Sequence, residues 1–311
     1  MKKLVQTQSV KIRQSPAKKS KWQKFKDNAD GHFLMTRPYS LAEYPLTTMV
    51  AKTNITPTLE PSLLDGASLA ATTLQWAALC WNLESVHKHA NRPEISKKVA
   101  NVAFGVAVTI GAIVNPMTLA FSAMHYLTCR SYAKKEGESN LLGAASFLIR
   151  GAGQTALYFF SQCFYTSTLS TKSLLVGGAV GLAIAARNLI GDLRDIKYDK
   201  KTFPIVFGET TSMVTASLLK IGACGLLYAT FGSVLMGAPL LIESAIGVFY
   251  KHHQNMHRIS VVGFSATLAN IVLANLGIME ATILVNLVYL SSLVGTVFYN
   301  KVARASNQDY E

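Results

Sequence analysis

The chain has 311 residues, half of them hydrophobic and only 15% charged. Soluble domains carry about 25% charged residues, and here the polar residues separate apolar runs long enough to form spanning helices, which excludes an ordinary soluble domain. The formal net charge of +13 does not indicate a nucleic acid partner, because no nucleic-acid-binding motif accompanies it.

In chain order, the sequence begins with a basic tail over residues 1–37, which holds ten Lys and Arg. We expect this tail to be cytoplasmic and to lie near anionic membrane lipid. The apolar runs that follow are rich in Gly, Ala, Ser and Leu, a composition that suits close helix packing in lipid. The expected spans are 38–55, 65–83, 98–114, 116–129, 143–163, 173–190, 208–229, 231–249, 260–278 and 281–299.

These segments predict an all-α, polytopic transmembrane helix bundle of nine or ten spans. The first span is the weakest because it contains Glu43 and Pro45, and the third and fourth can merge around Pro116. With the N-terminus in the cytoplasm, the inside segments and their edges hold 26 of the 30 Lys and Arg, which is the positive-inside pattern. We therefore predict a multi-pass transmembrane domain over 38–300 and a cytoplasmic C-terminal tail over 301–311.

The polar segment after the sixth span, GDLRDIKYDKKTFPIVFG, carries the carboxylates of Asp192, Asp195 and Asp199. If the helix continues past the span, spacings of three and four place all three on one face. Three carboxylates on one face repel one another and need a cation. Oxygen ligands without Cys or His favour Mg²⁺, which bridges to substrate phosphates. The alternative is a solvated loop whose acids only offset its own bases, which are Arg194, Lys197, Lys200 and Lys201.

The longer segment RNLIGDLRDIKYDKKTFPIVFG resembles the second aspartate-rich motif of the UbiA superfamily of intramembrane prenyltransferases. In that motif an Asp or Asn precedes DxxxD, and a basic stretch then leads to T-(L/F)-P-x-x-x-G. Asp195 and Asp199 match DxxxD, and Asp192 matches the polar residue before it. Thr202, Pro204 and Gly208 match the close, although this chain is shorter than the family between the last Asp and the Thr.

Other landmarks of the same family follow in order along the chain. The family opens its first span with Arg-Pro, and FLMTRPYS supplies Arg37 and Pro38. Its second span ends with NDxxDxxxD and an Arg-Pro element, and CWNLESVHKHANRPEIS supplies Asn82 and Arg92 with Pro93. The family places a Tyr and a Lys after the fourth span, where RSYAKKEGESN offers Tyr132, Lys134 and Lys135.

One departure from the family concerns the first aspartate-rich motif. Its aspartates are missing, and only Asn82 and Glu84 remain as oxygen ligands, with His87 and His89 nearby. In the family the two motifs face each other and each holds Mg²⁺ against a diphosphate. Here Glu84 either substitutes for a lost aspartate or is an ordinary loop residue.

The resemblance implies a helix bundle around a central cavity that is accessible to lipid, with prenyl transfer from a prenyl diphosphate to an aromatic or lipid-soluble acceptor. Mg²⁺ would assist diphosphate departure. Two other functions stay open, namely a non-catalytic membrane carrier or scaffold and a prenyl diphosphate cyclase. The implied metal ligands are Asp192, Asp195, Asp199, Asn82 and Glu84, and the implied substrate-binding residues are Asn82, Arg92, Tyr132, Lys134 and Lys197, with Tyr158 as a second aromatic ring for an allylic cation.

A few charged residues lie inside the expected spans, where a charge needs an oppositely charged or hydrogen-bonding partner. Arg150 and Glu243 fall near the middle of spans five and eight, and intramembrane charge is a functional hypothesis by default. We expect the two to pair, the alternative being that each lines an acceptor pocket. The histidines of KHHQNMHR are expected in a solvated loop, and the four cysteines are expected to be packing residues.

Overall fold

The computed structural model describes residues 42–86, 96–135, 140–197, 199–247 and 253–308. Within these ranges all of the regular structure is helical, which confirms the all-α bundle. The predicted N-terminal tail over 1–37 lies outside the described residues, and helix continues through most of the predicted C-terminal tail.

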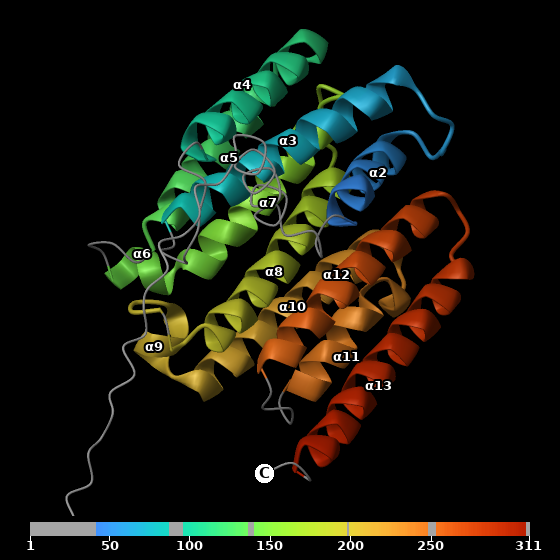
Figure 1. Ribbon diagram of the computed structural model, residues 1–311. Coiled ribbons are helices and arrows are strands. Elements are labelled where there is room, and N and C mark those ends of the chain that lie inside the picture. The colour runs from blue at the N-terminus through green and yellow to red at the C-terminus, as the bar shows by residue number, and fades with distance from the viewer. Residues whose placement is uncertain (1–41, 87–95, 136–139, 198, 248–252, 309–311) are drawn as a thin grey trace, which may run out of the picture.

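Ten helices of ten or more residues in the described part of the chain each overlap one of the ten expected spans (Figure 1). They are α2 (Glu43–Ile55), α3 (Leu63–Val86), α4 (Ser96–Val114), α5 (Thr118–Ala133), α7 (Ser146–Gln162), α8 (Thr171–Arg194), α10 (Glu209–Phe231), α11 (Ala238–Gly247), α12 (His253–Asn275) and α13 (Ala281–Gln308). Three short elements lie between them: α6 (Asn140–Ala144), α9 (Phe203–Phe207) and the 3₁₀ helix η2 (Val234–Gly237).

The two uncertain boundaries of the sequence have local explanations. Glu43 and Pro45 fall in the first turn of α2, where proline lacks only a hydrogen bond that the helix end cannot make. Pro116 lies in the short link between α4 and α5, so those two spans stay separate helices. The largest shifts are at three boundaries. Helix α12 begins at His253 and α11 at Ala238, each seven residues from the expected start, and α13 ends at Gln308, nine residues after the expected end.

The links between helices gather at two ends of the bundle. At one end, Asn115 Nδ2 donates to the Cys163 carbonyl at 2.8 Å, which joins the α4–α5 and α7–α8 links. At the same end, Asn275 Nδ2 donates to Thr53 Oγ1 at 3.2 Å. The opposite end carries α6, α9 and the end of α8 (Figure 1). This second end therefore contains the aspartate-rich segment.

Helix α8 is the central element, packed against α7, α10 and α12. Its approach to α7 is close because both helices carry glycine: a Cβ on Gly151 would lie 2.5 Å from the Gly181 carbonyl oxygen. Small residues of this kind let helix backbones approach in lipid. The C-terminal turn of α8 is thereby held at a defined place in the bundle end.

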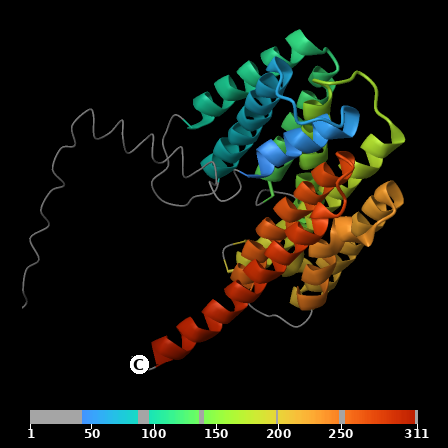
Figure 2. The ribbon, with the colours of Figure 1, turned by 90° about the vertical axis from the view of Figure 1, so that its right-hand side faces the viewer.

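Membrane insertion follows from helix length and composition. Among the described residues three helices are long and apolar enough to cross a membrane, namely α8, α10 and the Asn255–Asn275 part of α12. Large apolar side chains such as Leu218, Leu284 and Val288 are exposed on the outer helices, as expected for surfaces that face hydrocarbon. The chain is an integral membrane protein. Figure 2 shows α13 along the outside of the bundle, with its C-terminal end extending beyond the other helices.

The expected pairing of Arg150 with Glu243 is wrong. Glu243 on α11 instead binds Lys220 on α10, with Nζ and Oε2 2.6 Å apart, and Ser260 and Tyr289 donate hydrogen bonds to the same carboxylate. Arg150 stacks on Trp76, with its guanidinium carbon 4.2 Å from the ring centroid. The position of a charged residue within its own span does not show which other charge it contacts, because the two partners come from different helices.

Of the expectations for the cysteines and histidines, one is confirmed and one is partly wrong. All four cysteines are free and buried, which confirms them as packing residues. The solvated histidine loop is wrong for His253 and His257, which lie in the first turns of α12. His253 Nε2 is 3.0 Å from Glu209 Oε1, and His257 packs near Gly191. His252 lies outside the described residues.

Candidate functional site

Asp192 is the innermost acid of the aspartate-rich segment. It lies in the last turn of α8 and is only 2% exposed. Lys135 Nζ donates to its Oδ1 at 3.1 Å, and Ser146 Oγ donates to its Oδ2 at 3.2 Å. Asn188 Nδ2, one turn earlier on α8, reaches the same Oδ2 at 3.5 Å. Both carboxylate oxygens are thus engaged by donors of the protein, as a buried charge requires.

Lys135 connects this inner acid to an outer one. It follows the end of α5, is 4% exposed, and its Nζ also lies 3.3 Å from Asp199 Oδ2. Burial by itself lowers the pKa of Lys135, but Tyr132 and the carboxylates of Asp192 and Asp199 outweigh it and raise that pKa above its usual range. Lys135 therefore carries its positive charge at neutral pH.

Tyr132 completes the inner part of the site. Its hydroxyl donates to Asn188 Oδ1 at 2.9 Å, and its ring centroid lies 5.5 Å from Lys135 Nζ. The ring is buried in the apolar cluster formed by α2, α3, α4, α5 and α7. Tyr132 thus lies between the charged end of the bundle and its apolar interior.

Asp195 has a different environment, because α8 ends at Arg194 and Asp195 is its C-cap. The guanidinium of Arg194 binds Asp195 through two hydrogen bonds, at 2.7 Å to Oδ1 and 2.5 Å to Oδ2. Both side chains are about a third exposed (33% and 38%), so solvent screens this pair. The backbone of Asp199 donates to the Asp195 carbonyl at 3.0 Å, which adds one turn after the helix. The expectation that all three acids share one helix face therefore holds only up to Asp195.

The other expected site residues are placed less centrally. Lys134 is the exposed C-cap of α5, so the adjacent Lys135 is the lysine that enters the site. Lys197 is exposed on the turn after α8. Asn82 and Glu84 lie near the end of α3, but their side chains are outside the described residues, and so is all of Arg92.

Sequence reasoning missed Asn188 and Ser146, and it chose Lys134 over Lys135. Asn188 lies four residues before Asp192, a spacing that puts both on one face of α8. This periodicity was a usable signal for Asn188. Ser146 carried none, because a serine in a span is ordinary and its partner lies on another helix.

The three aspartates differ in how well they suit Mg²⁺. Asp192 does not fit as a ligand, since Lys135, Ser146 and Asn188 already use both of its oxygens. Asp195 and Asp199 lie four residues apart, but Arg194 holds both oxygens of Asp195 and Lys135 holds Oδ2 of Asp199. Mg²⁺ on this pair would have to displace Arg194, whose ion pair with Asp195 is about a third exposed and therefore weaker than a buried one. No set of three or more His, Cys, Asp or Glu side chains in the described ranges is arranged to hold a metal by itself.

A layer of buried aromatic and charged side chains lies one to two turns further inside. Arg187 on α8 forms an ion pair with Glu43 on α2, and the neighbouring Tyr44 packs on Trp76 with ring centroids 4.9 Å apart. The Tyr44 hydroxyl and the Trp76 Nε1 have no hydrogen-bond partner among the described residues. This layer offers ring faces and unused polar atoms next to the apolar interior.

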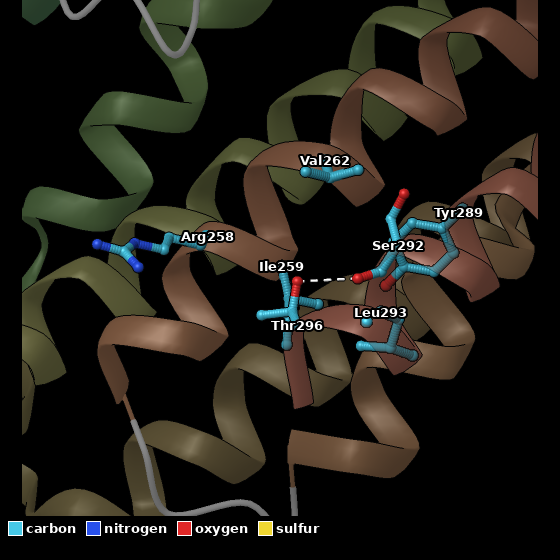
Figure 3. A pocket seen from close by; sticks show the side chains of 8 residues that line it. Arg258, Ile259, Val262, Tyr289, Ser292, Leu293 and Thr296 are labelled. Atoms are coloured by element: carbon cyan, nitrogen blue, oxygen red, sulfur yellow. Dashed lines mark hydrogen bonds between the residues drawn. The ribbon is translucent and has the colours of Figure 1, made fainter. Parts of the chain in front are cut away.

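A cavity of about 400 Å³ lies elsewhere, between α12 and α13 (Figure 3). Its wall is formed by Ile259, Val262, Tyr289, Leu293 and neighbouring residues. The hydroxyls of Ser292 and Thr296 donate within α13, and the Arg258 head group points away from the α13 side chains in Figure 3. This wall is mostly apolar, so the cavity is a groove between outer helices and not the site of the acids. The central chamber that the resemblance implies stays a prediction.

The fold of this chain is similar to that of solved membrane proteins. No family model and no curated protein matches the chain. A solved structure concerned with digeranylgeranylglyceryl phosphate synthase in membranes is 15% identical, with a TM-score of 0.55 over 82% of this chain and 99% of that one. A UbiA homologue from Archaeoglobus fulgidus is 13% identical, with a TM-score of 0.59 over 80% and 99%. The same homologue bound to DMAPP and Mg²⁺ is 11% identical, with a TM-score of 0.57. The chain therefore has the UbiA fold, as its motifs led us to expect.

Proposed function

We propose that this protein is an intramembrane prenyltransferase, which moves a prenyl group from a prenyl diphosphate to an aromatic or lipid-soluble acceptor. The observation that carries the proposal is the cluster of Asp192, Asp199, Lys135 and Tyr132 at one end of a UbiA fold. Homologous structures of this fold bind DMAPP and GPP with Mg²⁺. Buried acids and a buried lysine facing an apolar bundle suit a substrate with an anionic head and a hydrocarbon tail.

The positions of the site residues suggest a separate role for each of them. Asp195 and Asp199 would hold Mg²⁺, and the ion when bound neutralises charge on the departing diphosphate. Lys135 binds phosphate oxygens from the inner side, and Asp192 with Ser146 holds it in place. The exposed Lys197 and the arginine of the Arg-Pro element, Arg92, are proposed as further phosphate contacts.

The apolar interior protects the reacting carbon. Loss of diphosphate from an allylic carbon leaves a carbocation that water would capture, so water must be excluded. The ring of Tyr132 is buried near the charged end, and the face of such a ring stabilises a cation. The nucleophile of the acceptor then forms the new bond to the prenyl carbon and loses its proton. Tyr158, by contrast, contacts Asn54 near the end of α2, where its hydroxyl accepts a hydrogen bond from Asn54 Nδ2. We therefore do not assign it to the charged end.

The proposal is tested with the purified full-length protein, Mg²⁺ and labelled prenyl diphosphates of several chain lengths. We expect Mg²⁺-dependent release of diphosphate, abolished in Asp195→Ala and Asp199→Ala. Glu280→Ala, which removes an exposed acid from the α12–α13 link, is the matched control and should keep full turnover. Unchanged release in both aspartate variants would reject the site.

The mass of the product separates the enzymatic alternatives. Transfer adds the prenyl mass to an acceptor, whereas a cyclase gives an isomerised or rearranged hydrocarbon without one. The carrier or scaffold alternative is favoured by one feature, the loss of aspartates from the first motif. It predicts no diphosphate release with any prenyl chain length.

A further inference from the structure

We infer that the groove between α12 and α13 binds one anionic phospholipid of the surrounding membrane, with a hydrocarbon chain in the groove and the phosphate on Arg258. The groove has a volume of about 400 Å³ and has α12 as one wall and α13 as the other (Figure 3). It lies apart from the cluster of Asp192, Asp199 and Lys135, so the inference does not depend on the proposed activity.

The groove opens on the outer surface of the bundle, where the solvent is hydrocarbon. Val262 on the α12 wall is 45% exposed, and Val288 and Val294 on α13 are 59% and 63% exposed. Gly295 leaves part of the groove open, because a Cβ there would have nothing within 4 Å. Water is absent from the hydrocarbon layer, so the chains of lipid molecules fill such a hollow.

The wall of the groove suits a hydrocarbon chain. The Ser292 hydroxyl donates to the Val288 carbonyl at 3.0 Å, and the Thr296 hydroxyl donates to the Ser292 carbonyl at 2.8 Å. The Tyr289 hydroxyl donates to the Glu243 carboxylate at 3.4 Å. Each hydroxyl proton is thus used within the protein, and an apolar chain can cover this wall without breaking a hydrogen bond. The rest of the wall gains from apolar contact through Ile259, Val262 and Leu293.

The dimensions of the groove fit a chain better than a second transmembrane helix. Along α13 its lining residues run from Tyr289 to Thr296, which is a rise of about 10 Å. A helix about 10 Å wide occupies roughly 800 Å³ over that length, which is about twice the volume of the groove. A single hydrocarbon chain is much thinner and can lie within it.

Arg258 supplies a positive charge at one end of the groove. Its side chain lines the groove but is exposed, and no acid in the described ranges forms an ion pair with it. The preceding residue, His257, packs near Gly191 of α8, so Arg258 lies toward the end of the bundle that carries the acids. Its head group extends away from the α13 side chains (Figure 3), which leaves the groove itself to the chain.

The chemistry of arginine at this level of the membrane favours a phosphate. Arginine stems lie along apolar surface while their head groups reach the polar interface, and a guanidinium binds phosphate through two parallel hydrogen bonds. This end of the bundle is the one that the distribution of Lys and Arg predicts to be cytoplasmic, and the cytoplasmic leaflet contains anionic lipids. A zwitterionic lipid would bring its own cation near Arg258, so we expect it to bind more weakly.

Photolabelling locates the bound lipid. The purified full chain is reconstituted in phosphatidylcholine vesicles that contain a small fraction of phosphatidylglycerol with a diazirine on one acyl chain. After irradiation, mass spectrometry identifies the labelled residues. We expect label concentrated on segments 258–262 and 289–296, and clearly less label there when the diazirine is on phosphatidylcholine. Label spread evenly over the outer helices would overturn the inference, and so would an unlabelled groove that a second copy of the chain covers.

Two variants separate the chain from the head group. Gly295→Phe places a ring in the open part of the groove and should abolish labelling there, whereas Gly225→Phe, at an equally open position of α10, should not. Arg258→Gln should reduce labelling of the groove by phosphatidylglycerol about tenfold, as expected for loss of a hydrogen bond between charged groups. Arg130→Gln, an exposed arginine in the last turn of α5, is its control. Labelling at the wild-type level in both Gly295→Phe and Arg258→Gln would overturn the inference.

Discussion

Charged side chains inside this bundle have their partners on other helices. Lys220 on α10 binds Glu243 on α11, Arg187 on α8 binds Glu43 on α2, and Lys135 after α5 binds Asp192 on α8. Each pair removes the cost of an isolated buried charge, which would be several kcal/mol per ion. The pairs therefore specify which helices are neighbours, in addition to any role in chemistry.

The pair of Lys220 and Glu243 gives a prediction about stability alone. Lys220→Met leaves the Glu243 carboxylate buried with only hydroxyl donors, and we expect a loss of about 3–5 kcal/mol in the free energy of unfolding. Unfolding of the detergent-solubilised protein measures it. Lys98→Met, at an exposed position of α4, is the control and should change the free energy by less than about 0.5 kcal/mol.

The double variant of the same pair separates charge from packing. Lys220→Met with Glu243→Gln removes both charges while keeping similar volumes, and we expect it to recover most of the stability that Lys220→Met loses. A double variant as unstable as the single one would show that the stability comes from packing of the lysine stem and not from the ion pair.

At the scale of elements, the aspartate-rich turn is held by short helices at the same end of the bundle. Gly143 in α6 lies directly against the backbone that follows the acids: a Cβ there would collide with the Lys201 carbonyl and would lie 2.8 Å from the Lys135 carbonyl oxygen. Phe203 at the start of α9 packs edge-on against Phe147 of α7, with ring centroids 5.2 Å apart. Packing of α6 and α9 thus sets the distance between Lys135 and Asp199.

Gly143→Ala is therefore predicted to act on the site without touching a charged group. The new methyl group has to push apart two backbone segments, which separates Lys135 from Asp199. We expect weaker binding of a non-reactive prenyl thiodiphosphate and slower diphosphate release, by about tenfold if one charged contact is lost. Gly105→Ala, where nothing lies within 4 Å of the new Cβ, should leave both unchanged. Equal effects in the two variants would mean that helix stability alone is at work.

At the scale of the whole molecule, ten membrane crossings would put both chain termini on one side of the membrane, as the sequence predicts. The same end of the bundle carries the aspartate-rich turn and the end of α5 (Figure 1). The strong excess of Lys and Arg in the segments at this end indicates that it is cytoplasmic. We propose this orientation, in which the prenyl diphosphate is bound from the cytoplasm.

Labelling of single cysteines tests the orientation. After the four native cysteines are replaced, a cysteine at Glu60 in the α2–α3 link should react with a membrane-impermeant maleimide added to intact cells. A cysteine at Lys197 should react only after the cells are opened, because its turn lies at the other end of the bundle. The reverse pattern would invert the topology and would place the acids outside the cell.

Sequence by itself determined the series of apolar helices and their order, and it placed the acids in the polar link after the sixth expected span. Hydrophobicity over some twenty residues is a local property, and the bilayer converts it directly into a helix of fixed length. The motif around Asp192, Asp195 and Asp199 was also readable, because DxxxD and its Thr-Pro close are contiguous in the chain.

Only the tertiary structure decided which polar side chains meet. The neighbouring lysines Lys134 and Lys135 look alike in sequence, yet one is exposed and the other buried between two acids. Arg150 and Glu243 both lie inside spans but have different partners. Such choices depend on distances of a few ångströms between helices that are far apart in the chain. Those distances are set by packing, in particular by close approaches such as Gly151 with Gly181, and no local pattern encodes them.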